Sequence, residues 1–191
     1  VILTFLGLTV VSAYVGIHSK SLLIFMVVGA IVGACYFVYK APQSLVRFIV
    51  PEVLSLKYRL TVNGFDRIPE QGGVLLLGNH ISWIDWAIVS MASPRPVKFV
   101  MARAIYEKWY LRWFLDFFGC IPIAPGNYKN ALADVSRMLD EGEVVCLFPE
   151  GTISRTGHLT EFKRGYEQAA VESNAVIVPF YIRGLWGSTF S

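Results

Sequence analysis

The chain has 191 residues, of which 54% are hydrophobic and 16% are charged. This length suits one domain with a substantial core, but the apolar content exceeds that of an ordinary soluble domain and indicates contact with lipid. The net charge is +3, and no dense basic patch of the kind that binds nucleic acid is present. The cysteines Cys35, Cys120 and Cys146 lie far apart in apolar runs without disulfide or metal spacing, so we expect free thiols in a reducing compartment.

Two uncharged runs open the chain, Val1 to Ile17 and Ser21 to Tyr39, and a short polar segment separates them. As a helix, the second run would be about 28 Å long, close to the roughly 30 Å of a bilayer core. We therefore predict that residues 1–40 form a transmembrane or membrane-inserted helical hairpin. A pair of buried helices in a soluble bundle is the weaker alternative.

Basic residues follow the hairpin, at Arg47, Lys57 and Arg59, whereas its turn carries only Lys20. Positive charge beside a membrane segment favours the cytoplasmic side, so we expect the rest of the chain there. Because the sequence starts at Val1 rather than at a methionine and stops at Ser191, we also expect both ends to be cuts in a longer protein.

Residues 41–56 have the pattern of an amphipathic connector along a membrane surface, and residues 57–191 have the pattern of one domain. The expected strands are Tyr58–Val62, Val74–Leu77, Val97–Met101, Cys120–Ile123, Val144–Phe148 and Ala175–Ile182. The expected helices are Ile84–Met91, Arg103–Phe118, Asn130–Leu139 and Gly165–Glu172. Alternation of strands and helices predicts an α/β fold with a mixed, largely parallel sheet flanked by helices.

The expected helix over Arg103–Phe118 is rich in aromatic residues, with Lys108 and Arg112 among them. Rings beside cations suit the headgroup layer of a membrane, where a ring is half wet and a cation meets phosphate. The same spacing would also suit a helix whose aromatic side is core. Both interpretations stay open.

His80 and Asp85 follow an apolar run that has the pattern of a buried strand. A carboxylate at that spacing can reach one ring nitrogen and fix the tautomer, leaving the other nitrogen free to take a proton from a hydroxyl. The pair therefore predicts a general base, although a lone histidine near a strand end is more often structural. Ser82, inside the same segment, would allow a different chemistry, that of a hydrolase with an acyl-enzyme intermediate.

Three segments in order resemble a known family. Asn79-His80 with Asp85, then the segment Phe148-Pro149-Glu150-Gly151-Thr152, then Val178-Pro179 resemble the glycerolipid acyltransferases of the lysophosphatidic acid acyltransferase type. The resemblance covers roughly Tyr58 to Trp186. It implies that His80 and Asp85 are catalytic and that a serine at position 82 is not required.

The resemblance also implies an acceptor site, formed by Phe148, Pro149, Glu150, Gly151 and Thr152. Lys163, with Arg164 beside it, precedes an expected helix and is a candidate phosphate contact, although a solvated charged loop is nearly as good an interpretation. Backbone N–H groups near the histidine are candidate donors to the oxyanion of the reaction. No metal and no cofactor is implied, because a thioester of acyl carrier protein or coenzyme A is the co-substrate.

Within that family the sequence is most similar to the bacterial 2-acylglycerophosphoethanolamine acyltransferases, which are often fused to an acyl-carrier-protein synthetase. The hydrophobic hairpin resembles the end of a lysophospholipid transporter in fused members. These likenesses imply a membrane-bound enzyme that acylates a lysophospholipid at the cytoplasmic side of a bacterial inner membrane. A lysophosphatidate acyltransferase of phospholipid synthesis and a non-catalytic tail module of a lysolipid transporter are the alternatives.

Two positions bear on the acceptor's headgroup. Members specific for lysophosphatidate typically carry arginine where this chain has Pro125 and Ile153. A phosphate monoester carries a charge of about −1.5 to −2 and pairs well with arginine, whereas a phosphodiester carries a single charge. The departures therefore predict an acceptor like lysophosphatidylethanolamine.

Overall fold

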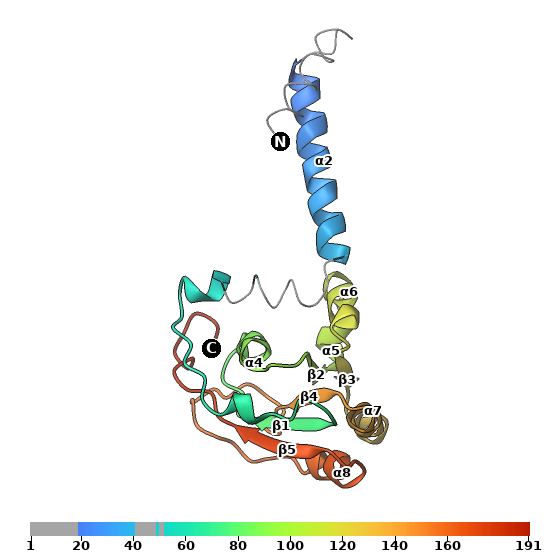
Figure 1. Ribbon diagram of the computed structural model, residues 1–191, viewed down its shortest axis with the longest axis vertical. Helices are drawn as coiled ribbons and strands as arrows, with labels where there is room; N and C mark the ends of the chain where they lie inside the picture. Colours follow the sequence, from blue (N-terminus) through green and yellow to red (C-terminus); the bar gives the residue numbers. More distant parts are fainter. Residues whose placement is uncertain (1–18, 41–48, 50–51) are drawn as a thin grey trace. The chain divides into compact units, whose positions relative to one another are not determined.

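The computed structural model describes residues 19–40, 49 and 52–191. The chain divides into two compact units, Val1–Val46 and Arg47–Ser191, and the boundary falls inside the expected connector. In the first unit, helix α2 spans Ser19–Lys40 (Figure 1). Residues 52–55 of the second unit form one helical turn.

The predicted hairpin can be followed only in part, because its first run, Val1 to Ile17, lies outside the described residues. Its second run coincides with α2. Across residues 19–40 and 52–191, no helix is both long enough and apolar enough to cross a membrane, so the predicted transmembrane helix is not supported there.

The second unit is a five-stranded sheet with helices on both faces (Figure 1). The strands are β1 Val74–Gly78, β2 Val97–Ala102, β3 Ile121–Ile123, β4 Val144–Leu147 and β5 Val176–Phe180, and their order is β3-β2-β4-β1-β5. The helices are α4 Asp85–Ala92, α5 Arg103–Tyr106, α6 Trp109–Phe117, α7 Tyr128–Asp140 and α8 Gly165–Val171, with a 3-10 turn at Phe65–Arg67. The predicted α/β class is confirmed, and every strand pair is parallel rather than mixed.

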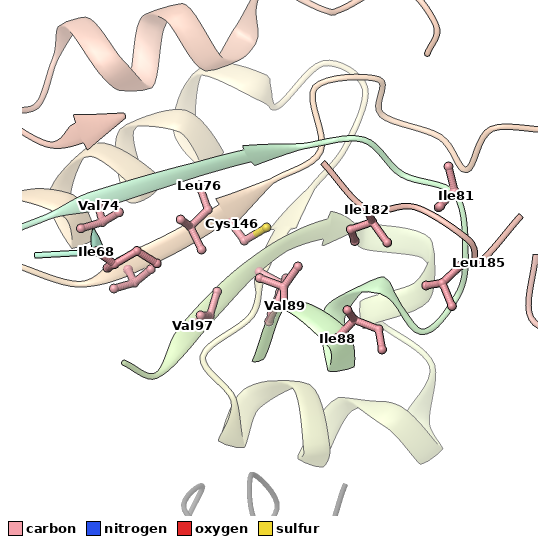
Figure 2. Packing of buried hydrophobic residues seen from close by; sticks show 12 residues of the cluster. Ile68, Val74, Leu76, Ile81, Ile88, Val89, Val97, Cys146, Ile182 and Leu185 are labelled. Carbon is pink, nitrogen blue, oxygen red and sulfur yellow. The ribbon is translucent and has the colours of Figure 1, made fainter. Parts of the chain in front are cut away.

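The central strands β1 and β4 are apolar at successive positions because both of their faces are buried. Val74 and Leu76 point to one side and Leu75 to the other, as the twofold repeat of a strand requires. Figure 2 shows the first side, where Val74 and Leu76 pack with Ile88 and Val89 of α4. A strand covered by helices on both faces reads as an unbroken hydrophobic run, which is typical of parallel sheets.

Helices α7 and α8 cover the opposite face. Leu132, Val135 and Leu139 of α7 and Ala169 of α8 pack with Leu75 in the second buried cluster. Right-handed crossover connections between parallel strands place helices on both faces in this way. The sheet is thus a rigid platform whose strand ends carry the loops described below.

Two predicted elements are wrong in detail. Residues 58–62 form no strand, although their alternation fits one. Leu60 and Val62 are exposed, and this segment is not among the strands of the sheet, so its backbone lacks the partner that a strand needs. Only Tyr58 at its start packs against the core.

The predicted helix over Arg103–Phe118 is two helices. Lys108 has an extended backbone, with φ −65° and ψ 118°, so α5 does not continue into α6, and Lys108 is the N-cap residue of α6. The hydroxyl of Tyr106 in α5 donates a hydrogen bond to Asp116 in α6, which ties the two together. Trp86 of α4 contacts the rings of Phe114 and Phe118, at centroid distances of 6.0 and 6.5 Å, so α6 packs on α4.

Candidate active site

The two sequence motifs meet where β1 and β4 end. These strands are parallel neighbours, with Leu77 opposite Leu147 in the last pair of their register. His80 and Glu150 follow at equal distances along the chain from that pair. Because the carboxyl ends of parallel strands face the same edge of a sheet, residues 70 positions apart become neighbours.

His80 and Asp85 form the predicted pair. The Nδ1 atom of His80 lies 2.8 Å from Oδ2 of Asp85, whose side chain is fully buried. The same oxygen accepts hydrogen bonds from the backbone N–H groups of Ile81, at 2.7 Å, and Ser82, at 3.0 Å. Since amide groups only donate, Oδ2 is an acceptor, and Nδ1 therefore carries the shared hydrogen.

That tautomer leaves Nε2 of His80 with a free lone pair. The side chain is 24% exposed, so the imidazole is neither fully buried nor free in solvent. The arrangement is that of a general base whose orientation is set by a buried carboxylate. Asp85 begins helix α4, so the helix fixes where this carboxylate lies.

The loop that follows β4 holds His80 from the other side. The ring of Phe148 stacks on the imidazole, with centroids 4.3 Å apart and planes 13° from parallel. The backbone N–H of His80 donates to Oε1 of Glu150 at 2.9 Å, and its carbonyl accepts from the N–H of Ser154 at 2.7 Å. The ring and both main-chain groups of the histidine are therefore fixed.

Asn79 anchors the start of the histidine loop to the segment after β5. Its amide donates to the carbonyl of Ile182 at 2.9 Å and accepts from the N–H of the same residue at 2.7 Å. The side chain is only 3% exposed, so these bonds satisfy a buried amide. Gly78, just before it, leaves room for the ring of Phe180, since an added Cβ would lie 2.1 Å from that ring.

The predicted acceptor-binding segment divides into buried and exposed parts. Pro149 and Glu150 are buried, whereas Gly151, Thr152 and Lys163 are exposed. Gly151 has a φ of +70°, and a Cβ added there would lie 2.7 Å from Nζ of Lys163. The structure thus brings the exposed side chain of Lys163 to the turn at Gly151.

The Ser82 alternative does not fit the geometry. Ser82 is fully buried, and its hydroxyl donates to the carbonyl of Phe190 at 3.0 Å and accepts from the N–H of Ile84 at 3.3 Å. A nucleophilic serine must present its oxygen to substrate and to a base. This serine instead shapes the loop.

The backbone N–H groups of the histidine loop are all engaged in hydrogen bonds within the protein. The N–H of His80 donates to Glu150, and the N–H groups of Ile81 and Ser82 both donate to the carboxylate of Asp85. The N–H of Trp83 donates to the carbonyl of Phe190. The N–H of Ile84 donates to Oγ of Ser82, and that of Asp85 donates to the carbonyl of Ser82. The six N–H groups from His80 to Asp85 thus all have partners within the domain, and the expectation that backbone N–H groups near the histidine bind the oxyanion stays a prediction.

Several residues of the site were not found from the sequence. Ser154 and Thr160 bond to His80 and Glu150, and Phe190 bonds to the histidine loop. They lie in irregular segments, where neither spacing nor hydrophobic pattern indicates a partner. The sequence signal available was only the richness in serine, threonine and glycine after Glu150.

A parallel α/β sheet that carries a histidine–carboxylate pair at the carboxyl ends of its strands, with Ser82 turned to a structural role, defines a class of enzyme-like domain suited to general-base chemistry. Residues 59–183 match the family model described as "Acyltransferase". The chain belongs to this acyltransferase family.

Proteins of known name agree with that assignment. The chain is 24% identical over 178 residues to a chloroplastic 1-acyl-sn-glycerol-3-phosphate acyltransferase of Arabidopsis thaliana, covering 88% of this chain and 49% of the relative. It is 25% identical over 138 residues to a 1-acyl-sn-glycerol-3-phosphate acyltransferase of Bacillus subtilis, covering 69% and 66%. It is 31% identical over 124 residues to a lyso-ornithine lipid O-acyltransferase of Rhizobium meliloti, covering 63% and 41%.

The fold also matches a solved structure. The 1-acyl-sn-glycerophosphate acyltransferase PlsC of Thermotoga maritima superposes with a TM-score of 0.62 at 19% identity, over 83% of this chain and 69% of that one. This likeness shows the fold. The chain spans about half the length, or less, of the curated relatives that it matches first.

Proposed function

We propose that the chain transfers a fatty acyl group from a thioester to the free hydroxyl of a lysophospholipid. The observation that carries this proposal is the His80–Asp85 pair at 2.8 Å, held against the loop after β4. Family membership and the names of the three relatives given above, which are acyltransferases of lysolipids, support it.

In this reaction Nε2 of His80 takes the proton of the acceptor hydroxyl as its oxygen attacks the thioester carbonyl carbon. The imidazolium that forms is stabilised by Asp85, whose Oδ2 already accepts from Nδ1. The tetrahedral intermediate then collapses, the carbon–sulfur bond breaks, and the thiolate leaves and takes the proton from Nε2. The products are a diacyl lipid and a free thiol, and His80 returns to its starting state.

The acceptor we propose is a lysophosphodiester such as lysophosphatidylethanolamine. Lys163, beside Gly151, offers one positive charge to the single negative charge of a phosphodiester. Members of the family that are specific for lysophosphatidate typically carry arginine at two positions where this chain has Pro125 and Ile153. Thr152, exposed on the same turn, offers a hydroxyl to the headgroup.

A domain that acylates lipid works at a membrane surface, and exposed aromatic rings support that location. Trp109 is 86% exposed and Trp113 is 43% exposed on α6, and Trp83 in the histidine loop is 61% exposed. Lys108, which caps α6, and Arg112 within it directly precede Trp109 and Trp113 and suit anionic headgroups. We place the domain on the cytoplasmic side of a bacterial inner membrane, with an acyl carrier protein or coenzyme A thioester as the soluble donor.

The test is acyl transfer by the protein with palmitoyl-coenzyme A or palmitoyl-acyl carrier protein and lysophosphatidylethanolamine in mixed micelles. We expect diacyl product from the wild type, and H80A should lower kcat by about 10²–10⁴-fold while the melting temperature stays near that of the wild type. No turnover with either donor would refute the proposal and favour a non-catalytic module. Release of free fatty acid without an acceptor would indicate a hydrolase instead.

The preference for an acceptor headgroup is measured by letting lysophosphatidate and lysophosphatidylethanolamine compete for one labelled acyl donor. We expect the phosphodiester to win, and K163A to weaken its binding more than its turnover. A clear preference for lysophosphatidate would show that the loss of the two arginines does not set specificity.

A further inference from the structure

We propose that Glu150 is a positioning residue for His80 and not a ligand of the acceptor. The inference rests on the proposed function, since it concerns how that site is kept in order. It reverses the role that the resemblance implies for this glutamate.

Both carboxylate oxygens of Glu150 are already engaged within the protein. Oε1 accepts from the backbone N–H of His80 at 2.9 Å. Oε2 accepts from the N–H of Thr160 at 3.0 Å and from its hydroxyl at 2.8 Å. The residue is only 3% exposed, so a lipid headgroup would have to displace these bonds to reach the carboxylate.

The bonds join segments that the sheet alone does not fix. β1 ends at Gly78 and β4 ends at Leu147, and loops follow both strands. Glu150 links the loop that carries His80 to the far side of its own loop at Thr160, and Ser154 N–H adds a second bond to the carbonyl of His80. Hydrogen bonds to an ionised acceptor are roughly twice as strong as neutral ones, so a carboxylate suits this role.

Positioning predicts a kinetic signature that substrate binding does not. If Glu150 sets the place of the imidazole, its loss should lower kcat and leave the KM for the acceptor nearly unchanged, because a displacement of about 1 Å in a reacting group can cost about a hundredfold in rate. If Glu150 instead held the headgroup, its loss should raise that KM.

The experiment compares E150Q, T160V and T160S with the wild type, using lysophosphatidylethanolamine and palmitoyl-coenzyme A. In E150Q one oxygen can still accept from His80, but the new amide group faces the donors of Thr160. T160V removes only the hydroxyl bond, and T160S restores it. E161Q, an exposed glutamate next to Thr160, is the matched control.

We expect E150Q to lower kcat by about tenfold or more with the acceptor KM within about twofold. T160V should show the same pattern to a smaller degree, T160S should regain the wild-type kcat to within about twofold, and E161Q should behave as the wild type. A melting curve for each variant checks the fold, and if E150Q fails to fold, T160V and T160S decide the question alone.

The proposal is overturned if E150Q raises the acceptor KM about tenfold at unchanged kcat, or if E150Q or T160V leaves both constants unchanged. Failure of the proposed function is distinct, because then the wild type itself gives no diacyl product with either donor.

Discussion

At the scale of single residues, the position of the His80 imidazole depends partly on groups that the sequence pattern does not reveal. Its spacing to Asp85 was enough to predict the pair and the tautomer. The stacking of Phe148 and the bonds from the backbone of His80 to Glu150 and Ser154 were not predicted, because neither a ring contact across two loops nor a main-chain hydrogen bond leaves a pattern in the sequence. The contact between His80 and Asp85 was therefore predicted, and the groups that hold the pair in place were not.

Cys120 gives a prediction about pH at the same scale. The pKa of its thiol is raised to about 11, chiefly by burial and to a smaller extent by the nearby Asp116, while a hydrogen bond involving the backbone of Phe99 acts in the opposite direction. Because the thiolate is the reactive form, alkylation of Cys120 in the folded protein should become about tenfold faster per pH unit from pH 8 to near 11. Mass spectrometry of the modified peptide after iodoacetamide treatment measures this.

The raised pKa of Cys120 also makes the stability of the fold depend on pH. A raised pKa means that the folded state holds the proton more tightly than the unfolded state, whose thiol titrates near 9. The contribution of Cys120 to stability is thus complete below pH 9 and is lost as the pH rises toward 11. If the alkylation rate levels off near pH 9, the thiol is not buried as described.

At the scale of secondary structure, strands were predicted better than the elements around them. β1 and β4 were predicted because their runs are apolar on both faces. The break at Lys108 between α5 and α6 was missed because no proline or glycine marks it. Residues 58–62 were misassigned because alternation shows which residues can be extended, and cannot show whether a partner strand exists.

The close approach of β1 and β5 gives a prediction about one element. Gly78 lies opposite Phe180, and a Cβ on it would enter that ring at 2.1 Å. We expect G78A to lower the free energy of unfolding by about 1–3 kcal/mol, since an overfilled contact must shift its neighbours. Urea denaturation measures it.

A double mutant shows whether the ring is the cause. In an F180A background the added methyl has space, so the cost of G78A should largely disappear, which reveals a coupling between the two positions. Equal costs in both backgrounds would mean that some other contact limits Gly78.

At the scale of the whole molecule, the two ends of the strands differ. The carboxyl ends carry the candidate site, and the segments before the amino ends are bonded to one another. Arg95, just before β2, donates to the carbonyls of Pro69 at 2.9 Å and Gly72 at 2.8 Å and to that of Gly142. These residues precede β1 and β4, so one guanidinium joins the amino ends of neighbouring strands.

This arrangement predicts a separation of stability from activity. R95M keeps the length of the side chain but removes the donors, and it should lower the free energy of unfolding by about 1.5–3 kcal/mol with kcat unchanged at 25 °C. R137M is the control, because Arg137 is 60% exposed and its pairs with Asp134 and Glu141 should contribute about 0–1 kcal/mol. Comparable losses in the two variants, or a fall in kcat with R95M, would contradict this division.

The α/β class was predicted because strand patterns alternate with helix patterns along the sequence, but the order of the strands in the sheet was not predicted. That order depends on crossovers, whose path the local pattern does not contain. Neighbours in the sequence such as β1 and β2 are not neighbours in the sheet, because β4 lies between them. The contact between His80 and Glu150, which depends on that order, was therefore not predicted from the pattern.

The central place of β4 has a consequence for the order of events during synthesis. Until residues 144–147 have left the ribosome, β1 has neither of its partners, because both β4 and β5 come later in the chain. Contacts between distant segments form slowly, and the apolar β1 stays uncovered during that time. A nascent chain therefore cannot bring His80 against its supporting loop before the domain is nearly complete.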